Sequence, residues 1–194
     1  MAEKEQLKMP VITLVRHAEA THNAAFNETK SDFVFMDAKH QDAHLTEKGV
    51  KQATEVGKDL EMTSFDAVFC SPLTRCIQTM ECIIPFFYDK SVITLHDNLL
   101  EKQSTKHICN KRKTRYELIA LYPNYKIVTN SDLSPSYAHR ESDEAVAARM
   151  SSLIKTICDN HDKDEKILIV SHYNAILALT GVELPNAGRI VLKY

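Results

Sequence analysis

The chain has 194 residues, 44% of them hydrophobic and 26% charged, which is enough for one well-buried domain and marginal for two. The net charge of -2 excludes a strongly basic nucleic-acid-binding protein, and no apolar stretch reaches the roughly 18 residues that a membrane span needs. The five cysteines form no Cys-x-x-Cys pair, so we expect reduced thiols. The N-terminus has no apolar core of a signal peptide, so we expect a cytoplasmic protein. From the charge and the lack of a long apolar stretch, we expect neither nucleic acid nor membrane as a partner.

The hydrophobic pattern predicts alternating strands and helices after a Lys- and Glu-rich lead, residues 1–9, that we expect to be flexible. In chain order it predicts a strand at 11–15, a helix after Thr46 with an apolar face from Val50 to Leu60, a strand at 67–70, a helix at 73–84, a strand at 91–95, a helical patch at 116–121, a helix at 142–158, a strand at 167–170, a helix at 175–179 and a last strand at 190–192. Pro72 suits the first turn of the helix that begins near it.

The alternation of strands and helices predicts the fold class. It is typical of a mostly parallel sheet with helices on both faces, so we predict an α/β fold with three layers, α/β/α. Residues 96–140 are more polar and partly basic, and we interpret them as a cap inserted into a single domain that spans residues 1–194. No internal repeat and no linker rich in Gly, Ser or Pro divides the sequence.

Polar clusters follow three of the predicted strands. Arg16 and His17 follow the first strand, residues 71–75 with Arg75 follow the second, and residues 171–172 with His172 follow the strand at 167–170. If these strands are parallel, their carboxyl ends meet at one edge of the sheet, where α/β proteins place their sites. Guanidinium groups offer a planar fork to phosphate oxygens, and a histidine among them has a lowered pKa, as a neutral nucleophile requires. A single histidine is usually structural, but three such clusters together predict a phosphate site.

Five segments carry a resemblance to a known family. They are LVRHAEATHN (14–23), HLTEKGVKQA (44–53), CSPLTRCIQT (70–79), ESDEAVAAR (141–149) and LIVSHYNAI (168–176). In this order they resemble the conserved stretches of the histidine phosphatase superfamily, which is also called phosphoglycerate mutase-like. The resemblance covers roughly residues 11–180 and implies the phosphoglycerate mutase-like fold.

The resemblance implies a role for each matching residue. His17 corresponds to the residue that becomes phosphohistidine, and Arg16 and Arg75 to arginines that bind the phosphate. His172 corresponds to the second histidine, which contacts the phosphate, and Asn23 to a residue of the phosphate pocket. The family implies no cofactor and no metal, and the sequence has no H-E-x-x-H motif or Cys/His ligand set.

The proton donor is the least constrained role. Glu101, in NLLEKQ (98–103), matches the usual position of the acid in the family. Asp97 and Glu141 are nearby alternatives. Such an acid protonates the departing oxygen and then activates water as a base.

The resemblance leaves three functions open for a small phosphorylated substrate. We favour a phosphatase that releases the phosphoryl group of a phosphomonoester to water, because the cap resembles a branch of small phosphatases and lacks the Tyr-Gly-rich segment that follows the acid in mutases. A phosphoglycerate mutase-type transfer is the first alternative. A non-catalytic phosphate-binding protein on the same fold is the second, and an unrelated α/β domain would require chance matches.

Two positions depart from the family pattern, and one region is open to two interpretations. Ala18 replaces the glycine that usually follows the nucleophile, and Tyr173 stands after the second histidine where a small residue is common. The basic rim, defined as Lys106, residues 111–113 and Arg115, either meets an acidic substrate or is a solvated loop. The identity of the substrate and the oligomeric state are not predicted.

Overall fold

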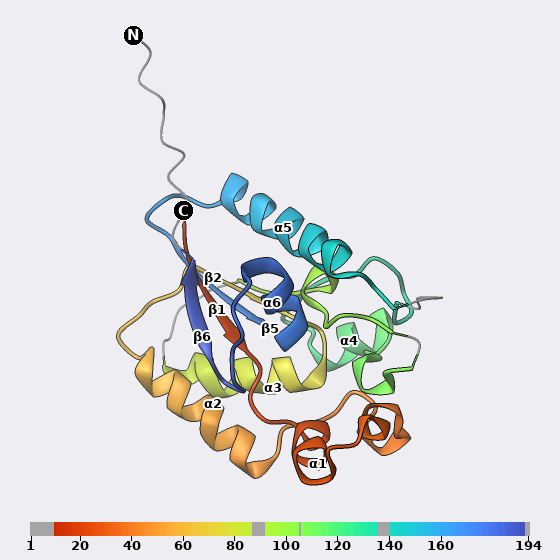
Figure 1. Cartoon of the computed structure of the whole chain (residues 1–194). Helices are drawn as coiled ribbons and strands as arrows, with labels where there is room; N and C mark the ends of the chain where they lie inside the picture. Colours follow the sequence, from red (N-terminus) through yellow and green to blue (C-terminus); the bar gives the residue numbers. More distant parts are fainter. Residues whose placement is uncertain (1–9, 87–91, 105, 136–139, 193–194) are drawn as a thin grey trace.

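The computed structural model describes residues 10–86, 92–104, 106–135 and 140–192 (Figure 1). The expected flexible lead, residues 1–9, and Ser91 at the start of a predicted strand lie outside the described residues. In the described part of the chain, no helix combines the length and the apolar character that crossing a membrane requires.

The centre of the structure is a six-stranded sheet in the order β4-β3-β2-β5-β1-β6. The strands are β1 (Val11–Arg16), β2 (Ala67–Cys70), β3 (Val92–His96), β4 (Lys126–Val128), β5 (Lys166–Ser171) and β6 (Arg189–Leu192). Every neighbouring pair is parallel except β1 and β6. The predicted mostly parallel α/β fold is therefore confirmed.

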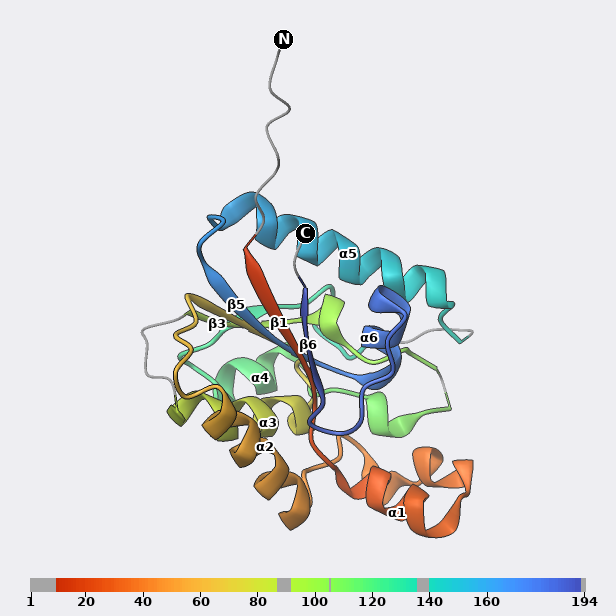
Figure 2. The ribbon, with the colours of Figure 1, turned by 60° about the vertical axis from the view of Figure 1, so that its left-hand side comes forward.

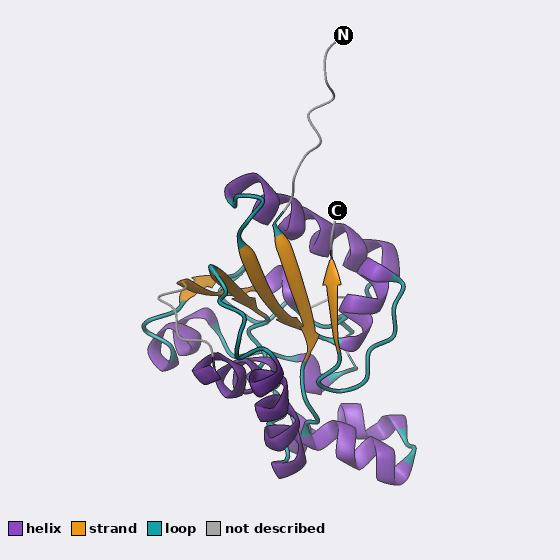
Figure 3. Ribbon diagram, turned by 90° about the vertical axis from the view of Figure 1, so that its left-hand side faces the viewer, coloured by secondary structure: helices purple, strands orange, loops and turns teal. Residues whose placement is uncertain are grey.

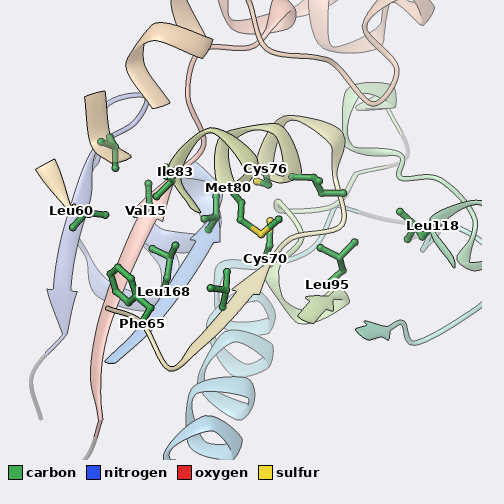
Figure 4. Close-up of a cluster of buried hydrophobic side chains, with 14 residues drawn as sticks. Val15, Leu60, Phe65, Cys70, Cys76, Met80, Ile83, Leu95, Leu118 and Leu168 are labelled. Atoms are coloured by element: carbon green, nitrogen blue, oxygen red, sulfur yellow. The ribbon is translucent and has the colours of Figure 1, made fainter. Parts of the chain in front are cut away.

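Helices cover both faces of this sheet, as Figures 1 and 3 show. On one face lie α2 (Glu47–Asp59) and α3 (Thr74–Ile83), and on the other lie α5 (Asp143–Asn160) and α6 (Tyr173–Thr180). Figure 4 shows the core under α2 and α3, where Met80 and Ile83 pack against Val15 and Leu168. The apolar run of β1 is buried because both of its faces are covered.

Local sequence signals set the ends of these helices. The Thr46 hydroxyl accepts a hydrogen bond from the Gly49 N–H (3.0 Å) and begins α2, and Ser142 caps α5 in the same way through Ala145. Gly181, at φ 70°, ends α6 in the left-handed conformation. Pro72 lies before the N-cap of α3 and not in its first turn, which corrects the prediction.

Two further parts of the fold differ from the sequence prediction. Val50 is 44% exposed, although it was predicted on the buried face of α2. The segment after β1 forms α1 (Thr21–Thr29) and two 3-10 turns (Asp32–Met36 and Ala38–His40), none of which was predicted. Figure 2 shows α1 beyond the carboxyl end of β1, apart from the sheet.

The expected cap at residues 96–140 is only partly outside the sheet. It contains α4 (Arg115–Leu121), whose Leu118 belongs to the core under α3. Its β4 pairs with β3 in parallel and becomes an edge strand. The interpretation of the whole segment as an inserted cap is therefore wrong for residues 126–128, whereas Glu101, His107, Cys109, Asn110 and Arg140 of the segment line the pocket described below.

Candidate active site

Five of the six residues singled out in the sequence line one pocket of about 350 Å³. They are Arg16, His17, Asn23, Arg75 and Glu101. The sixth, His172, is fully buried, and its ring centroid lies 5.1 Å from that of His17. The loops after β1, β2 and β5 therefore meet at one place.

The backbone of His17 is fixed by the end of β5 and by the segment that leads into β6. Its N–H donates to the Ser171 carbonyl oxygen (2.9 Å), and its carbonyl oxygen accepts from the Ala187 N–H (3.2 Å). Its ring Nδ1 lies 2.8 Å from the Ala18 carbonyl oxygen. Because a carbonyl oxygen can only accept, Nδ1 carries the proton, and Nε2 keeps the lone pair that a nucleophile needs.

The site keeps its buried histidines uncharged. Burial lowers the pKa of His17, His22 and His172 well below the ordinary value, and the neighbouring Arg75 guanidinium lowers each further. We call these three residues the buried histidines of the site. A neutral His17 among permanent positive charges is the protonation state in which an imidazole can attack phosphorus.

Arg75 is almost completely buried, and two hydrogen bonds fix its guanidinium. Nη1 donates to the Cys109 carbonyl oxygen (2.8 Å), and Nη2 donates to Asn110 Oδ1 (2.9 Å). Its Nε is buried without a hydrogen-bond partner among the described residues. The cap segment thus orients Arg75 and leaves one donor available.

Arg16, which lines the same pocket, is also held by a hydrogen bond to a carbonyl oxygen. Its Nη1 donates to the Leu184 carbonyl oxygen (2.7 Å), and its Cζ lies 4.8 Å from the centre of the Tyr173 ring. That stacking is a cation–π contact, so the Tyr173 ring packs against Arg16 and helps to hold it in place. The Nε of Arg16 is also buried without a partner in the described structure.

A third donor comes from His22, which the sequence did not single out. Asn23 Nδ2 donates to His22 Nε2 (3.1 Å), so Nδ1 of His22 carries the proton, and it too is buried and unpaired within the described residues. Buried donors in folded proteins are nearly always satisfied. Three such donors lie on residues that line one pocket, and an anion with several oxygens can satisfy all of them.

His172 lies behind the pocket and not in its lining. Its Nε2 is 2.7 Å from the Ser71 hydroxyl, its ring is edge-on to His17 at 63°, and Cys76 Sγ lies 3.4 Å from Nε2. The ring is therefore held firmly beside His17. Direct contact between His172 and a bound phosphate remains a prediction from the family resemblance.

The three candidate acids have very different surroundings. Glu101 lines the pocket and accepts from the Lys102 N–H (2.7 Å) and the Asn174 N–H (3.3 Å). Both oxygens of Asp97 pair with the Arg112 guanidinium (2.8 and 2.9 Å) in a site with almost no exposure.

Glu141 is occupied in the same way as Asp97. Its two oxygens accept from Arg149 (2.8 and 3.0 Å), and one also accepts from the Gln103 N–H (3.0 Å). Neither Asp97 nor Glu141 is among the described residues that line the pocket. The geometry therefore favours Glu101 as the acid that can reach a ligand.

The comparison with known proteins decides the family. Residues 12–187 match the histidine phosphatase superfamily (branch 1), which covers most of the chain. The chain belongs to the histidine phosphatase superfamily. This assignment agrees with the resemblance seen in the sequence and with the paired histidines and arginines of the pocket.

Members of this superfamily and structures of similar fold include both phosphatases and mutases. A probable phosphoglycerate mutase from Arthroderma benhamiae is 29% identical over 198 residues, covering 91% of this chain but only 58% of the relative's length. Ecdysone phosphate phosphatase from Bombyx mori, solved in complex with tungstate, is 16% identical with a TM-score of 0.68 (95% of this chain, 89% of that one). Phosphoglycerate mutase from Bacillus anthracis is 19% identical with a TM-score of 0.64 (97% and 91%).

In this histidine phosphatase superfamily member, the basic rim predicted from the sequence is less uniform than expected. Arg112 is buried in its pair with Asp97, and Lys113 donates to Asp42 and to the Thr74 hydroxyl. Lys106 and residues 111–113 line a second, larger pocket of about 930 Å³ beside the first. Arg112 and Lys113 of the rim are therefore structural, whereas Lys106 and Lys111 are exposed.

Other departures and additions concern residues that sequence reasoning passed over. Ala18 is fully buried, and its N–H donates to the Thr79 hydroxyl (3.0 Å), so the methyl group is accommodated. Phe26, Phe35 and His107 also line the pocket. Their only sequence signal is their position in loops near motif residues, because nothing in their spacing marks them.

Proposed function

We propose that this chain is a phosphatase that hydrolyses a phosphomonoester through a phosphohistidine on His17. The observation that supports it most directly is the neutral His17 beside two fixed guanidinium groups whose Nε donors have no partner in the described structure. A phosphate dianion would satisfy those donors and neutralise the cationic pocket.

In the first step, the substrate phosphate binds between Arg16 and Arg75 with its ester oxygen towards Glu101. The lone pair of His17 Nε2 forms a bond to phosphorus as the bond to the ester oxygen breaks, and protonated Glu101 gives its proton to that oxygen. The positive charge left on the imidazole is stabilised because Nδ1–H donates to the Ala18 carbonyl oxygen.

In the second step, the Glu101 carboxylate takes a proton from water as the water oxygen attacks phosphorus. The bond to Nε2 breaks, its electron pair returns to the imidazole, and inorganic phosphate leaves. Glu101 is protonated again, so the cycle closes. The unpaired arginine donors, fixed before the reaction, stabilise the charge on the non-bridging oxygens through both steps.

Phosphoglycerate mutase activity is the second candidate, because the curated relative from Arthroderma benhamiae carries that name. The chain spans just over half of that relative, so the name transfers only as an alternative. The absence from residues 96–140 of the Tyr-Gly-rich segment expected after the acid in mutases supports hydrolysis instead.

The test is an assay with an aryl phosphate and with 3-phosphoglycerate, measuring free phosphate and isomerised product separately. We expect free phosphate without isomerisation, loss of activity in His17→Ala, and normal activity in the control His161→Ala. The control removes a histidine paired with Glu165, just before the amino end of β5 and opposite the end that carries His172. Isomerisation that exceeds phosphate release would instead establish the mutase.

The intermediate provides an independent check. Glu101→Gln should accumulate an acid-labile phosphohistidine on His17 with an aryl phosphate, because a good leaving group needs no proton but water activation needs the base. Turnover that survives in His17→Ala would refute the proposed mechanism. Phosphate binding with neither turnover nor a trapped phosphohistidine would identify a non-catalytic member of the superfamily.

A further inference from the structure

Three aromatic rings line the active-site pocket on the side of α1. We define Phe26 of α1, Phe35 of the turn Asp32–Met36, and His107 of the cap as the aromatic wall. Phe26 and Phe35 stack at 5.2 Å with an angle of 27° between their planes, and Phe35 lies 5.5 Å from His107. The wall thus spans three separate segments of the chain.

The aromatic wall continues directly from the reacting groups. The His22 ring lies 6.1 Å from His17 and 6.1 Å from Phe35, so rings extend from the nucleophile outward. All three wall residues are only partly buried, whereas the rings of a packed core would be covered. Their remaining surface lines the same pocket as His17.

The wall presents an uncharged, flat surface between charges at the pocket edge. Burial and the nearby Arg140 lower the pKa of His107, so its ring is neutral. Asp32 and Arg140 also line the pocket and carry opposite charges. Within the lining of this pocket these two charges do not form a cluster of one sign at the wall, whereas a planar ring finds a stacking partner there.

We propose that the aromatic wall binds the leaving group of the substrate, and that the preferred substrate is a phosphomonoester whose leaving group carries a planar ring. This rests on the proposed phosphatase function. Aryl phosphates and nucleoside monophosphates share that chemistry. With phosphorus at His17, the leaving group extends from the ester oxygen into the rest of the same pocket, which the aromatic wall lines. Phe26 and Phe35 are then specificity-determining residues.

The competing explanation is that the rings only pack α1 against the turn that follows it. Phe35→Leu separates the two explanations because it keeps an apolar side chain but removes the flat ring. The matched control is Phe33→Leu in the same turn, since Phe33 is 77% exposed and is not among the described residues that line the pocket.

The substrates are benzyl phosphate and cyclohexylmethyl phosphate, which share the same ester linkage and differ in the planarity of the ring. We expect wild type and Phe33→Leu to prefer benzyl phosphate in kcat/KM. Phe35→Leu should lower that preference about 2- to 12-fold, the equivalent of one lost aromatic pair. A structural role alone would lower both substrates equally.

Binding of the non-hydrolysable benzylphosphonate and cyclohexylmethylphosphonate, measured by calorimetry, tests the wall apart from catalysis. A preference for benzylphosphonate that Phe35→Leu removes supports the inference even if no ester is hydrolysed. The absence of ester hydrolysis would contradict only the proposed phosphatase function. Equal affinities, unchanged in Phe35→Leu, overturn the inference even if phosphate is released. Competition by phenyl phosphate or by uridine monophosphate then shows which class of ring the wall prefers.

Discussion

Substitution of Arg75 separates the charge of this residue from its geometry. In Arg75→Ala, the Nε donor and the positive charge both disappear. Loss of one preorganised donor to a developing charge costs about 3 kcal/mol of transition-state stabilisation, or on the order of 10²-fold in kcat. We expect that loss in the release of phosphate from an aryl phosphate.

The pH dependence of Arg75→Ala gives a second readout. Burial is the larger cause of the low pKa of His17, and Arg75 adds to it. Without Arg75, the pKa of His17 rises towards its ordinary value. Because only neutral His17 attacks, the acidic limb of the kcat/KM profile should move to higher pH. Arg75→Lys keeps the charge, so its limb should move less while kcat still falls, because lysine has no planar fork.

The fold must survive for these results to be informative. Both variants remove the guanidinium that donates to the Cys109 carbonyl oxygen and to Asn110 Oδ1. Each buried acceptor left unsatisfied costs about 1–3 kcal/mol of stability. Thermal unfolding checks this, and Arg189→Ala, which removes a surface pair with Asp59, is the control. If kcat of folded Arg75→Ala stayed near the wild-type value with an unmoved acidic limb, Arg75 would not hold the phosphate.

Three further predictions concern stability. Asp97→Asn breaks a buried ion pair with Arg112 and should lower the free energy of unfolding by about 3–5 kcal/mol in urea titrations. The control Asp159→Asn, in an exposed pair with Lys155, should change it by less than about 0.5 kcal/mol. Similar values for the two variants would contradict this prediction. Gly49→Ala brings a methyl group into steric conflict with the Glu19 carbonyl oxygen, so we expect overpacking to destabilise the fold by about 1–3 kcal/mol and to lower the melting temperature. An unchanged melting temperature would show that α2 can shift to make room. The buried histidines of the site have lowered pKa values in the folded state, so the unfolded chain gains protons first as the pH falls below about 6.5. In phosphate-free buffer, each histidine should therefore lower the free energy of unfolding by about 1 kcal/mol between pH 6.5 and 5.5. A free energy of unfolding that stays constant over this range would argue against their burial as neutral rings.

The buried strands and the capped helices could be predicted because each carries a local signal. The β-branched run at 11–15 predicts a buried strand, and both of its faces are covered in the sheet. Thr46 and Ser142 are N-caps whose hydroxyls accept hydrogen bonds from the first turns of α2 and α5. The order of the strands along the sheet and the antiparallel β6 depend on packing at a distance, which no short pattern records.

The site residues divide along the same line. His17 and Arg75 stand at strand ends inside recognisable motifs, so the sequence was enough to single them out. Asn110 acts through its bond to Arg75, and His22 through its place beside His17, and no short sequence pattern marks either residue. Helix α1 was missed because THNAAFNET has no clear apolar face, and His22 is its one buried residue.

The position of β1 in the sheet has a consequence for synthesis of the chain. Both of its hydrogen-bonded neighbours, β5 and β6, lie near the opposite end of the sequence, and the backbone of His17 is held by Ser171 and Ala187. During synthesis β1 is made well before β5 and β6, so it cannot pair until the polypeptide has been extended through them. Until then an apolar segment stays unprotected, so nascent chains that stall before β5 should need chaperones and should be inactive.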